Sequence, residues 1–454
     1  MFRRVAAAAA IVAVSVLTPQ AQRATPVSPQ DLAAIWDAER VSPPVPPLMD
    51  HADVERRITA VAQNDSSRFF LERVGTSLEG RSINLITVGT GPFRVLLWSQ
   101  MHGDEPTATA ALLDVFEYFQ RHRTDPAVQR ILSSLTLYVI PMLNPDGAER
   151  FQRRNAQGID VNRDALSLQT PEGRTLKAVR DRFNPRVGFN LHNQGWGTSV
   201  GDPPKPATIS LLSVAYDKPR SENAGRRLTK KLCAVIRDAL EPFASGQIGR
   251  YDDEFEVRAF GDNITLWGTP VVLIETGPFS ASDPDPVLVR MNFVAILSAL
   301  DALATGSVER ADPKRYEQLP MNESRLFYIL VQQATVVSGT GVPPFTADIG
   351  IAGNRRVRTG DGERRIQMQA NIADLGDLRT YGALRTIDAR GRVAAPLWDP
   401  SLKEGDEVDL PDFSKSPSAR TIATGQSGEI VLLRSANDPA KPASRYVVDT
   451  ILRY

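Results

Sequence analysis

The stretch RVLLWSQMHGDEPTATAALLDVFEYFQ, residues 94–120, joins two kinds of hydrophobic pattern. Its first part, 94–100, is an apolar run of strand length, and in 105–120 the apolar residues recur at helical spacing. His102 and Glu105 lie at the junction, in a chain that has only four histidines. Where strands and helices alternate, ligands collect at the carboxyl ends of the strands, so this junction is a candidate site.

Strands and helices alternate on both sides of this stretch, up to about residue 308. Two strands are expected within 71–89. The hydrophobic pattern predicts further strands at 135–141, 187–191 and 270–275, and helices at 49–63, 221–241 and 285–304. The predicted fold class is therefore α/β, with a mixed, mostly parallel central sheet flanked by helices.

The C-terminal part of the chain has a different texture. Runs such as GEIVLLRS (428–435) and RYVVDTILRY (445–454) are short and β-rich, and Gly, Pro and Asp turns separate them. This pattern predicts a β-sandwich-like accessory domain over residues 309–454. Such a domain could bind a partner or the cell wall.

The N-terminus has the pattern of a secretory signal. Arg3 and Arg4 precede an apolar run, Val5–Leu17, which is shorter than the roughly 20 residues that cross a bilayer. We predict a signal peptide over 1–24 that is cleaved, export to the periplasm or the cell exterior, and no membrane span in the mature chain. A Pro-rich linker is predicted at 25–47, followed by a catalytic domain at 48–308.

Charge and cysteine content bound the possible partners. The 53 basic and 53 acidic residues cancel, so net charge indicates neither nucleic acid nor an anionic membrane as a partner. The single cysteine, Cys233, cannot form an internal disulfide. The amphipathic helical pattern around it predicts a buried core thiol.

His102 and Glu105 have the residue types and spacing of metal ligands. A catalytic zinc takes three protein ligands, from nitrogen and oxygen donors, plus a water molecule. His192 supplies the third, because it follows the predicted strand 187–191 and precedes a polar loop. The other histidines, His51 and His122, compete poorly, since His122 ends a charged helix where a solvated cation is ordinary. We predict one zinc ion per chain.

A loop rich in arginine follows the predicted strand 135–141. It begins with a turn at Asn144–Gly147 and continues to four polar residues without helical spacing, which are Arg153, Arg154, Asn162 and Arg163. A guanidinium presents a planar fork that matches a carboxylate. Two separated arginine positions therefore suggest one site for a substrate carboxylate and another for developing negative charge.

Glu275 ends a strand that is otherwise apolar, within GTPVVLIETGPFS (268–280). A carboxylate at such a place is costly unless it has a chemical role. Glu275 is therefore a candidate base.

Taken in order, these motifs resemble the zinc carboxypeptidase family, the carboxypeptidase A-like peptidases. The family's H-x-x-E stands here as His102 to Glu105, its N-P-D-G as Asn144–Gly147, and its R-x(4)-G-x-D-x-N-R as Arg153 to Arg163. The resemblance covers about residues 45–308. The compact arginine stretch is most similar to bacterial members that trim peptidoglycan peptides, although Asp164 replaces the asparagine that usually follows.

The resemblance implies a reaction and a role for each residue. It implies hydrolysis of the C-terminal bond of a peptide or peptidoglycan peptide, with zinc on His102, Glu105 and His192. Glu275 would be the general base, and Arg153, or alternatively Arg154, would stabilise the oxyanion. Asn162 and Arg163 would bind the terminal carboxylate of the substrate. Tyr251 would correspond to the family's mobile tyrosine. The stretch from Gly249 to Trp267 should line the side-chain pocket, where Arg258 favours an acidic substrate and Phe255, Phe260 and Trp267 an apolar one.

Two other functions fit part of this pattern. A zinc-dependent deacylase or amidase of the desuccinylase and aspartoacylase type uses the same metal ligands. A non-catalytic metal-containing binding protein would need the ligands alone. The Asn144–Gly147 turn and the predicted export favour a peptidase over the first, and Glu275 argues against the second.

Overall fold

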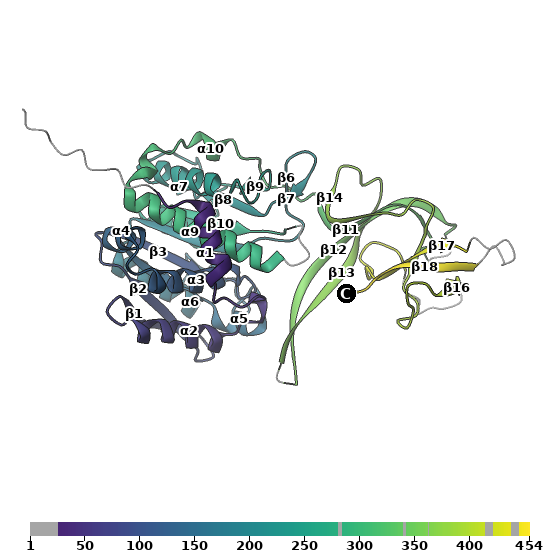
Figure 1. Cartoon of the computed structure of the whole chain (residues 1–454), viewed down its shortest axis with the longest axis horizontal. Helices are drawn as coiled ribbons and strands as arrows, with labels where there is room; N and C mark the ends of the chain where they lie inside the picture. Colours follow the sequence, from purple (N-terminus) through teal and green to yellow (C-terminus); the bar gives the residue numbers. More distant parts are fainter. Residues whose placement is uncertain (1–25, 280–283, 339–341, 362, 414–420, 437–444) are drawn as a thin grey trace, which may run out of the picture.

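The computed structural model describes residues 26–279, 284–338, 342–361, 363–413, 421–436 and 445–454. The predicted signal peptide lies outside these residues. An α/β region comes first in the chain and a β-rich region follows it, with the long β12–β13 hairpin between the two in the view of Figure 1.

An eight-stranded mixed sheet forms the centre of the first region, in the order β1-β2-β4-β3-β5-β10-β8-β9. Its middle strands β4, β3, β5 and β10 run parallel to their neighbours within this group. This arrangement confirms the predicted fold class. The strands are β1 (Phe69–Thr76), β2 (Ser82–Val88), β3 (Phe93–Ser99), β4 (Leu135–Ile140), β5 (Val187–Asn193), β8 (Ile209–Ser213), β9 (Ile248–Arg250) and β10 (Val271–Thr276).

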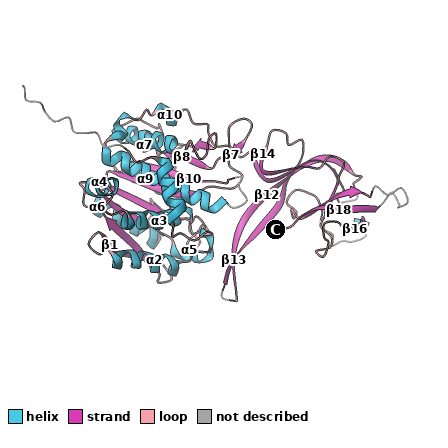
Figure 2. Cartoon of the chain, viewed as in Figure 1, coloured by secondary structure: helices cyan, strands magenta, loops and turns pink. Residues whose placement is uncertain are grey.

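Helices cover both faces of this sheet (Figure 2). On β3, Val95 and Leu97 pack into the larger core, and Leu96 and Trp98 into the smaller core on the opposite face. The larger core includes residues of α1 (Pro29–Glu39), α2 (His51–Asn64), α3 (Thr107–Arg121), α4 (Pro126–Ser134), α7 (Ala224–Leu240) and α9 (Pro284–Thr305). The smaller core includes residues of α6 (Pro171–Phe183) and α8 (Phe260–Leu266), and the shorter helices are α5 (Pro145–Arg150), α10 (Lys314–Glu317), η1 (Pro46–Leu48), η2 (Val161–Arg163) and η3 (Ser307–Arg310).

Helix α9 is the one helix among the described residues that is long and apolar enough to cross a membrane. Of its apolar window, 78% is buried inside the protein, and it contacts α1, α3, α4 and α7. Its hydrophobic composition is therefore that of a core helix. Cys233 on α7 is buried in the same core, as predicted.

The segment predicted as a linker is instead part of the α/β region. Ser28 caps α1 and Pro29 occupies its first turn. Trp36 Nε1 donates to Asp114 Oδ2 at 2.7 Å, and the N–H groups of Val41 and Ser42 donate to Asp114 Oδ1 at 2.8 and 2.7 Å. The prolines that suggested a linker follow this helix and lead into η1.

The α/β region also continues beyond the predicted boundary at residue 308. Val308, Tyr316 and Leu319 pack into the larger core, and the Ser213 N–H donates to the Tyr316 hydroxyl at 3.0 Å. The first strand of the β-rich region begins only at Leu326.

The C-terminal region, predicted to be β-sandwich-like, is β-rich, and its described strands belong to one hydrogen-bonded sheet in the order β13-β12-β11-β15-β17-β18-β16. Strand β11 is long enough to pair with β12 along one edge and with β14 and then β15 along the other. The strands are β11 (Leu326–Val336), β12 (Phe345–Gly360), β13 (Glu363–Gly376), β14 (Gly382–Asp388), β15 (Val393–Pro396), β16 (Glu407–Asp409), β17 (Ile430–Ser435) and β18 (Arg445–Leu452). A small pair, β6 (Ser199–Val200) and β7 (Lys205–Pro206), lies in the first region.

Candidate metal centre and substrate cleft

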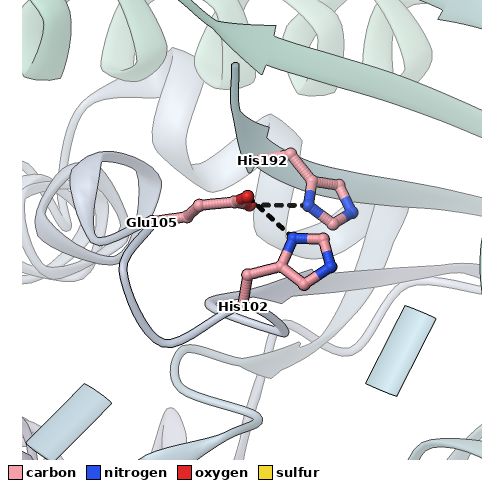
Figure 3. A group of neighbouring side chains, drawn as sticks. All are labelled: His102, Glu105 and His192. Carbon is pink, nitrogen blue, oxygen red and sulfur yellow. Dashed lines mark hydrogen bonds and ion pairs between the residues drawn. The ribbon is translucent and has the colours of Figure 1, made fainter. Parts of the chain in front are cut away.

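The three predicted metal ligands converge at the carboxyl end of the sheet (Figure 3). His102 lies in the loop after β3, Glu105 just before α3, and His192 near the end of β5. His102 Nδ1 is 2.7 Å from Glu105 Oε1, and His192 Nδ1 is 2.7 Å from Glu105 Oε2. All three residues are buried, and their ligand atoms lie within 4.8 Å of one another.

The loop that carries His102 rests on the Asn144–Gly147 segment. The side chain of Asn144 caps α5 by accepting from the Gly147 N–H at 2.9 Å, and its Nδ2 donates to the Met101 carbonyl at 3.2 Å. Gly103 packs so closely here that a Cβ would lie 1.9 Å from the Gly147 carbonyl carbon. The predicted turn is therefore the start of a short helix that supports the ligand loop.

Asp160 connects the metal ligands to the arginine loop. Its Oδ1 lies 3.1 Å from His102 Nε2, and its Oδ2 accepts from Arg153 Nε at 3.0 Å. A carboxylate on the second ring nitrogen of a ligating histidine fixes the ring's orientation. Asp160 belongs to the arginine motif, but no local pattern in the sequence indicates its contact with His102, which is 58 positions away.

The electrostatics of the cluster favour a cation. Burial opposes ionisation of Glu105, but the two histidines outweigh it and lower the pKa of this carboxyl. Burial lowers the pKa of His192, which favours its neutral form. Burial would also lower the pKa of His102, yet Glu105 and Asp160 raise it to about 9. A metal ion binds the ionised carboxylate and the neutral imidazoles, so it would displace the proton that Glu105 and Asp160 stabilise on His102.

The donor set suits zinc. Two imidazole nitrogens and one carboxylate oxygen form the three-ligand arrangement of catalytic zinc sites. The Nδ1 atoms of both histidines face the Glu105 carboxylate, and Asp160 occupies the far side of His102. His102, Glu105 and His192 are therefore the residues that could hold the ion.

Glu275 lies beside His192 because of strand register. In the parallel pairing of β10 with β5, Glu275 is the partner of His192. Its Oε2 is buried and has no hydrogen-bond partner among the described residues. Burial and the charge of Glu105 raise the pKa of Glu275 well above its usual value. Burial therefore favours the protonated form of this carboxyl more than in an exposed glutamate.

The remaining predicted residues line one cavity together with Glu275, namely Arg153, Asn162, Arg163 and Tyr251. Asn162 Oδ1 accepts from the Phe260 N–H at 2.9 Å, and Arg163 Nη1 donates to the Asn162 carbonyl at 2.8 Å. The charge of Glu275, followed by burial, raises the pKa of Tyr251 to about 12. Arg154 does not line this cavity and donates instead to the Gly158 carbonyl.

Five further carboxylates contribute to the cavity lining. The lining includes Asp252, Glu254, Glu256, Asp262 and Glu323. Asp262 is half-buried, and burial together with Glu256 raises its pKa to about 7, with Arg163 acting in the opposite direction.

The residues from which side-chain preference was expected do not form this lining. Phe255, Arg258, Phe260 and Trp267 are all absent from it. Arg258 pairs with Glu256 at 3.3 Å. Phe260 and Trp267 pack in the smaller core. The expected basic and aromatic contacts are therefore absent, and an acidic wall is present in their place.

Part of the chain is similar in sequence to known carboxypeptidases. Residues 54–210 match a family model described as zinc carboxypeptidase. Carboxypeptidase 2 of Trichophyton tonsurans is 29% identical over 144 residues, which cover 31% of this chain and 26% of that protein. Carboxypeptidase SOL1 of Arabidopsis thaliana is 29% identical over 195 residues, 38% of this chain and 38% of that protein. The structure of a metallo-carboxypeptidase from Burkholderia cenocepacia has a TM-score of 0.44 and 18% identity, and it covers 55% of this chain and 69% of that one. The matched part of this chain thus spans 26% and 38% of the lengths of the two curated relatives.

We expect the purified protein to contain about one zinc ion per chain, measured by elemental analysis. His192→Ala should lose the ion, since two ligands hold zinc poorly against a chelator. Asp160→Asn should keep the ion but bind it about 10- to 100-fold more weakly, because His102 loses its orienting partner. His122→Ala, which alters a histidine that contacts Glu39, is the matched control and should keep full occupancy. Full zinc content in His192→Ala would exclude this ligand set.

Proposed function

We propose that the chain, whose residues 54–210 match the zinc carboxypeptidase family model, is a zinc-dependent carboxypeptidase that hydrolyses the C-terminal bond of a peptide. One observation carries the proposal. His102 of the buried His-Glu-His cluster lines one cavity with Asn162, Arg163 and Glu275, whose buried Oε2 has no hydrogen-bond partner among the described residues. These are the parts that cleavage next to a free carboxylate requires.

Glu275 is the proposed base. A zinc ion on the three ligands would supply a water of lowered pKa and polarise the scissile carbonyl. Glu275 then accepts a proton from the attacking water and passes it to the leaving amine. Burial and the charge of Glu105 raise its pKa, which makes this carboxylate a stronger proton acceptor than an exposed glutamate.

The arginines divide two tasks. Arg153 Nη1 lies 3.1 Å from His102 Nδ1, and from this position beside the proposed metal ligands it would stabilise the oxyanion. Arg163 and Asn162 lie in the same cavity as Glu275, where a guanidinium fork would bind the terminal carboxylate of the substrate. Tyr251 lines the same cavity as Glu275. Asp160 is a positioning residue, because it touches both His102 and Arg153.

The acidic wall suggests the class of C-terminal residue. Asp262 is a half-buried carboxylate in the cavity and accepts a hydrogen bond from the Glu256 N–H at 3.0 Å. A cationic side chain would compensate its charge, whereas Glu256 already pairs with Arg258 and Arg163. We therefore propose a preference for a lysine-like or arginine-like residue at the C-terminus.

The site of action and the source of the peptide are further proposals. The pattern of Arg3, Arg4 and the apolar run that follows supports export to the periplasm or the cell exterior. In that compartment, peptides and the peptide part of peptidoglycan are both accessible substrates.

Glu275→Gln should keep its zinc and its melting temperature while losing at least about 100-fold in kcat, because only proton transfer is removed. Zinc content, thermal melting and turnover of one peptide would be measured on the same preparation. Turnover close to that of the wild type would mean that the base lies elsewhere.

The wild type should strongly prefer a free-acid peptide to its C-terminal amide. Arg163→Ala should reduce this preference by weakening the binding of the free-acid peptide, since a charge-assisted contact of about 1.5–3 kcal/mol is lost. Arg153→Ala should slow both substrates alike, because its contact forms with the oxyanion. Arg154→Ala, on the same loop but outside the cavity, is the control. An unchanged ratio in Arg163→Ala would favour a deacylase or an endopeptidase.

The ratio of kcat/KM for lysine-terminated over leucine-terminated peptides should rise with pH through about 7. Below this pH Asp262 is protonated and cannot compensate the lysine cation, whereas above it the carboxylate is ionised. Asp262→Asn should make the ratio independent of pH and lower it at pH 8 by about tenfold. Glu254→Gln, on the exposed rim of the cavity, should leave the pH profile intact. A ratio that falls with rising pH would contradict the assignment.

A further inference from the structure

The β12–β13 hairpin of the C-terminal region contacts the α/β region beside the metal centre. Its strands have 16 and 14 residues and stay in antiparallel register to Gly360 and Glu363 at the far end. Arg355 on β12 binds both carboxylate oxygens of Asp285, at 2.6 and 2.7 Å. Its guanidinium also lies 4.8 Å from the ring centre of Trp196. Planar guanidinium contacts of this kind fix both position and angle.

A second arginine holds the other strand of the hairpin. Arg364 on β13 donates to the carbonyl oxygens of Ala148 and Glu149, both at 3.2 Å, and to that of Pro47 at 3.4 Å. Its side chain is only 10% exposed. The hairpin is therefore attached to the α/β region at two points, one on each strand.

The loop after the third metal ligand is also built against the C-terminal region. Asn322 Nδ2 donates to Gln194 Oε1 at 2.8 Å. Trp196 packs edge-on against Tyr328 of β11, with ring centres 5.7 Å apart. The position of this loop, which forms part of the cleft, thus depends on residues outside the α/β region.

A second cavity lies between the hairpin and the metal centre. Glu105 and Arg153 form its inner wall, and Asn354, Arg355 and Arg356 of β12 form its outer wall. It shares Arg153 and the residues 193–195 with the cavity that contains Asn162 and Arg163. The two cavities therefore meet at the metal centre. If the C-terminal residue of a substrate occupies the cavity of Arg163, the residues before it enter the cavity under the hairpin.

The charge of the hairpin indicates what those residues are. Between 354 and 369 the sequence has arginines at 355, 356, 358, 364 and 365, and acids only at 361 and 363. Arg355 and Arg364 are engaged in attachment. Arg356 lines the cavity, and the one hydrogen bond found for it among the described residues joins its Nε to Gln369 Oε1 at 3.2 Å. Its guanidinium is thus available to a carboxylate.

We propose that the β12–β13 hairpin forms the wall of the substrate cleft that binds the residues preceding the scissile bond, and that Arg356 selects acidic side chains there. The proposal rests on the proposed carboxypeptidase function, since that function defines which end of the peptide lies under the hairpin. The C-terminal region is then a determinant of substrate specificity.

Peptide binding to the full mature chain carrying Glu275→Gln tests this proposal without turnover. The peptides end in lysine and have either two glutamates or two glutamines immediately before it, and calorimetry gives each Kd. The glutamate peptide should bind about threefold more tightly, which is the size expected of a solvent-exposed ion pair, and added salt should reduce the difference. Adding Arg356→Glu should reverse the preference, and adding Arg356→Gln should bring the ratio close to one.

Arg365→Glu is the matched control, because Arg365 lies on the same hairpin, is 72% exposed and does not line the cavity. It should leave the ratio unchanged, and thermal melting should verify that every variant is folded. A ratio that Arg356→Glu does not alter would overturn the hairpin wall.

Amidated versions of both peptides separate this proposal from the carboxylate anchor. If free-acid and amidated peptides bind equally well but Arg356 variants still change the ratio for glutamate over glutamine peptides, only the binding of the terminal carboxylate by Asn162 and Arg163 would be contradicted. A retained free-acid preference without any Arg356 dependence would contradict the hairpin wall alone. Absence of binding by every peptide would contradict both.

Discussion

The parallel pairing of β5 with β10 is the constraint on which the rest of the site depends. It sets Glu275 directly opposite His192. Leu191 and Ile274, the preceding residues, both pack in the larger core. A slip of one residue would replace the carboxylate opposite His192 with Ile274 or Thr276, whose side chains cannot act as a base. The apolar packing of both strands therefore fixes the distance between the proposed base and the metal ligand.

The buried charges around this pairing form a connected network. An isolated carboxylate inside a protein is destabilising, but Glu105 lies between two imidazole rings, and Asp160 joins His102 to Arg153. Each polar group holds its neighbour in one orientation, so little reorganisation is needed when a cation binds. Glu275 Oε2, which has no partner among the described residues, is the group left available for proton transfer.

The same logic extends to the C-terminal region. Its contacts with the α/β region come from arginines that bind a carboxylate, an aromatic face and a row of carbonyl oxygens. These contacts have a fixed geometry, unlike a loose apolar interface. The region thereby holds the loop after His192 and adds a basic wall to the cleft. In the proposed function, this β-rich region forms part of the substrate path.

The sequence alone predicted the α/β class, most core strands and helices, and His102, Glu105 and His192 as candidate ligands, because hydrophobic periodicity and short motifs can be recognised without the fold. It also predicted the cavity residues Asn162, Arg163 and Tyr251 through resemblance. It missed α1, because the prolines that follow this helix suggested a linker. The contact between Trp36 of α1 and Asp114 is apparent only in the fold. Three features become apparent only in the tertiary structure. They are the contacts of Asp160 with His102 and Arg153, the carboxylates that line the cavity with Asp262, and the position of the β12–β13 hairpin beside the metal centre. These features depend on side chains far apart along the chain, and folding, not spacing, brings such side chains together.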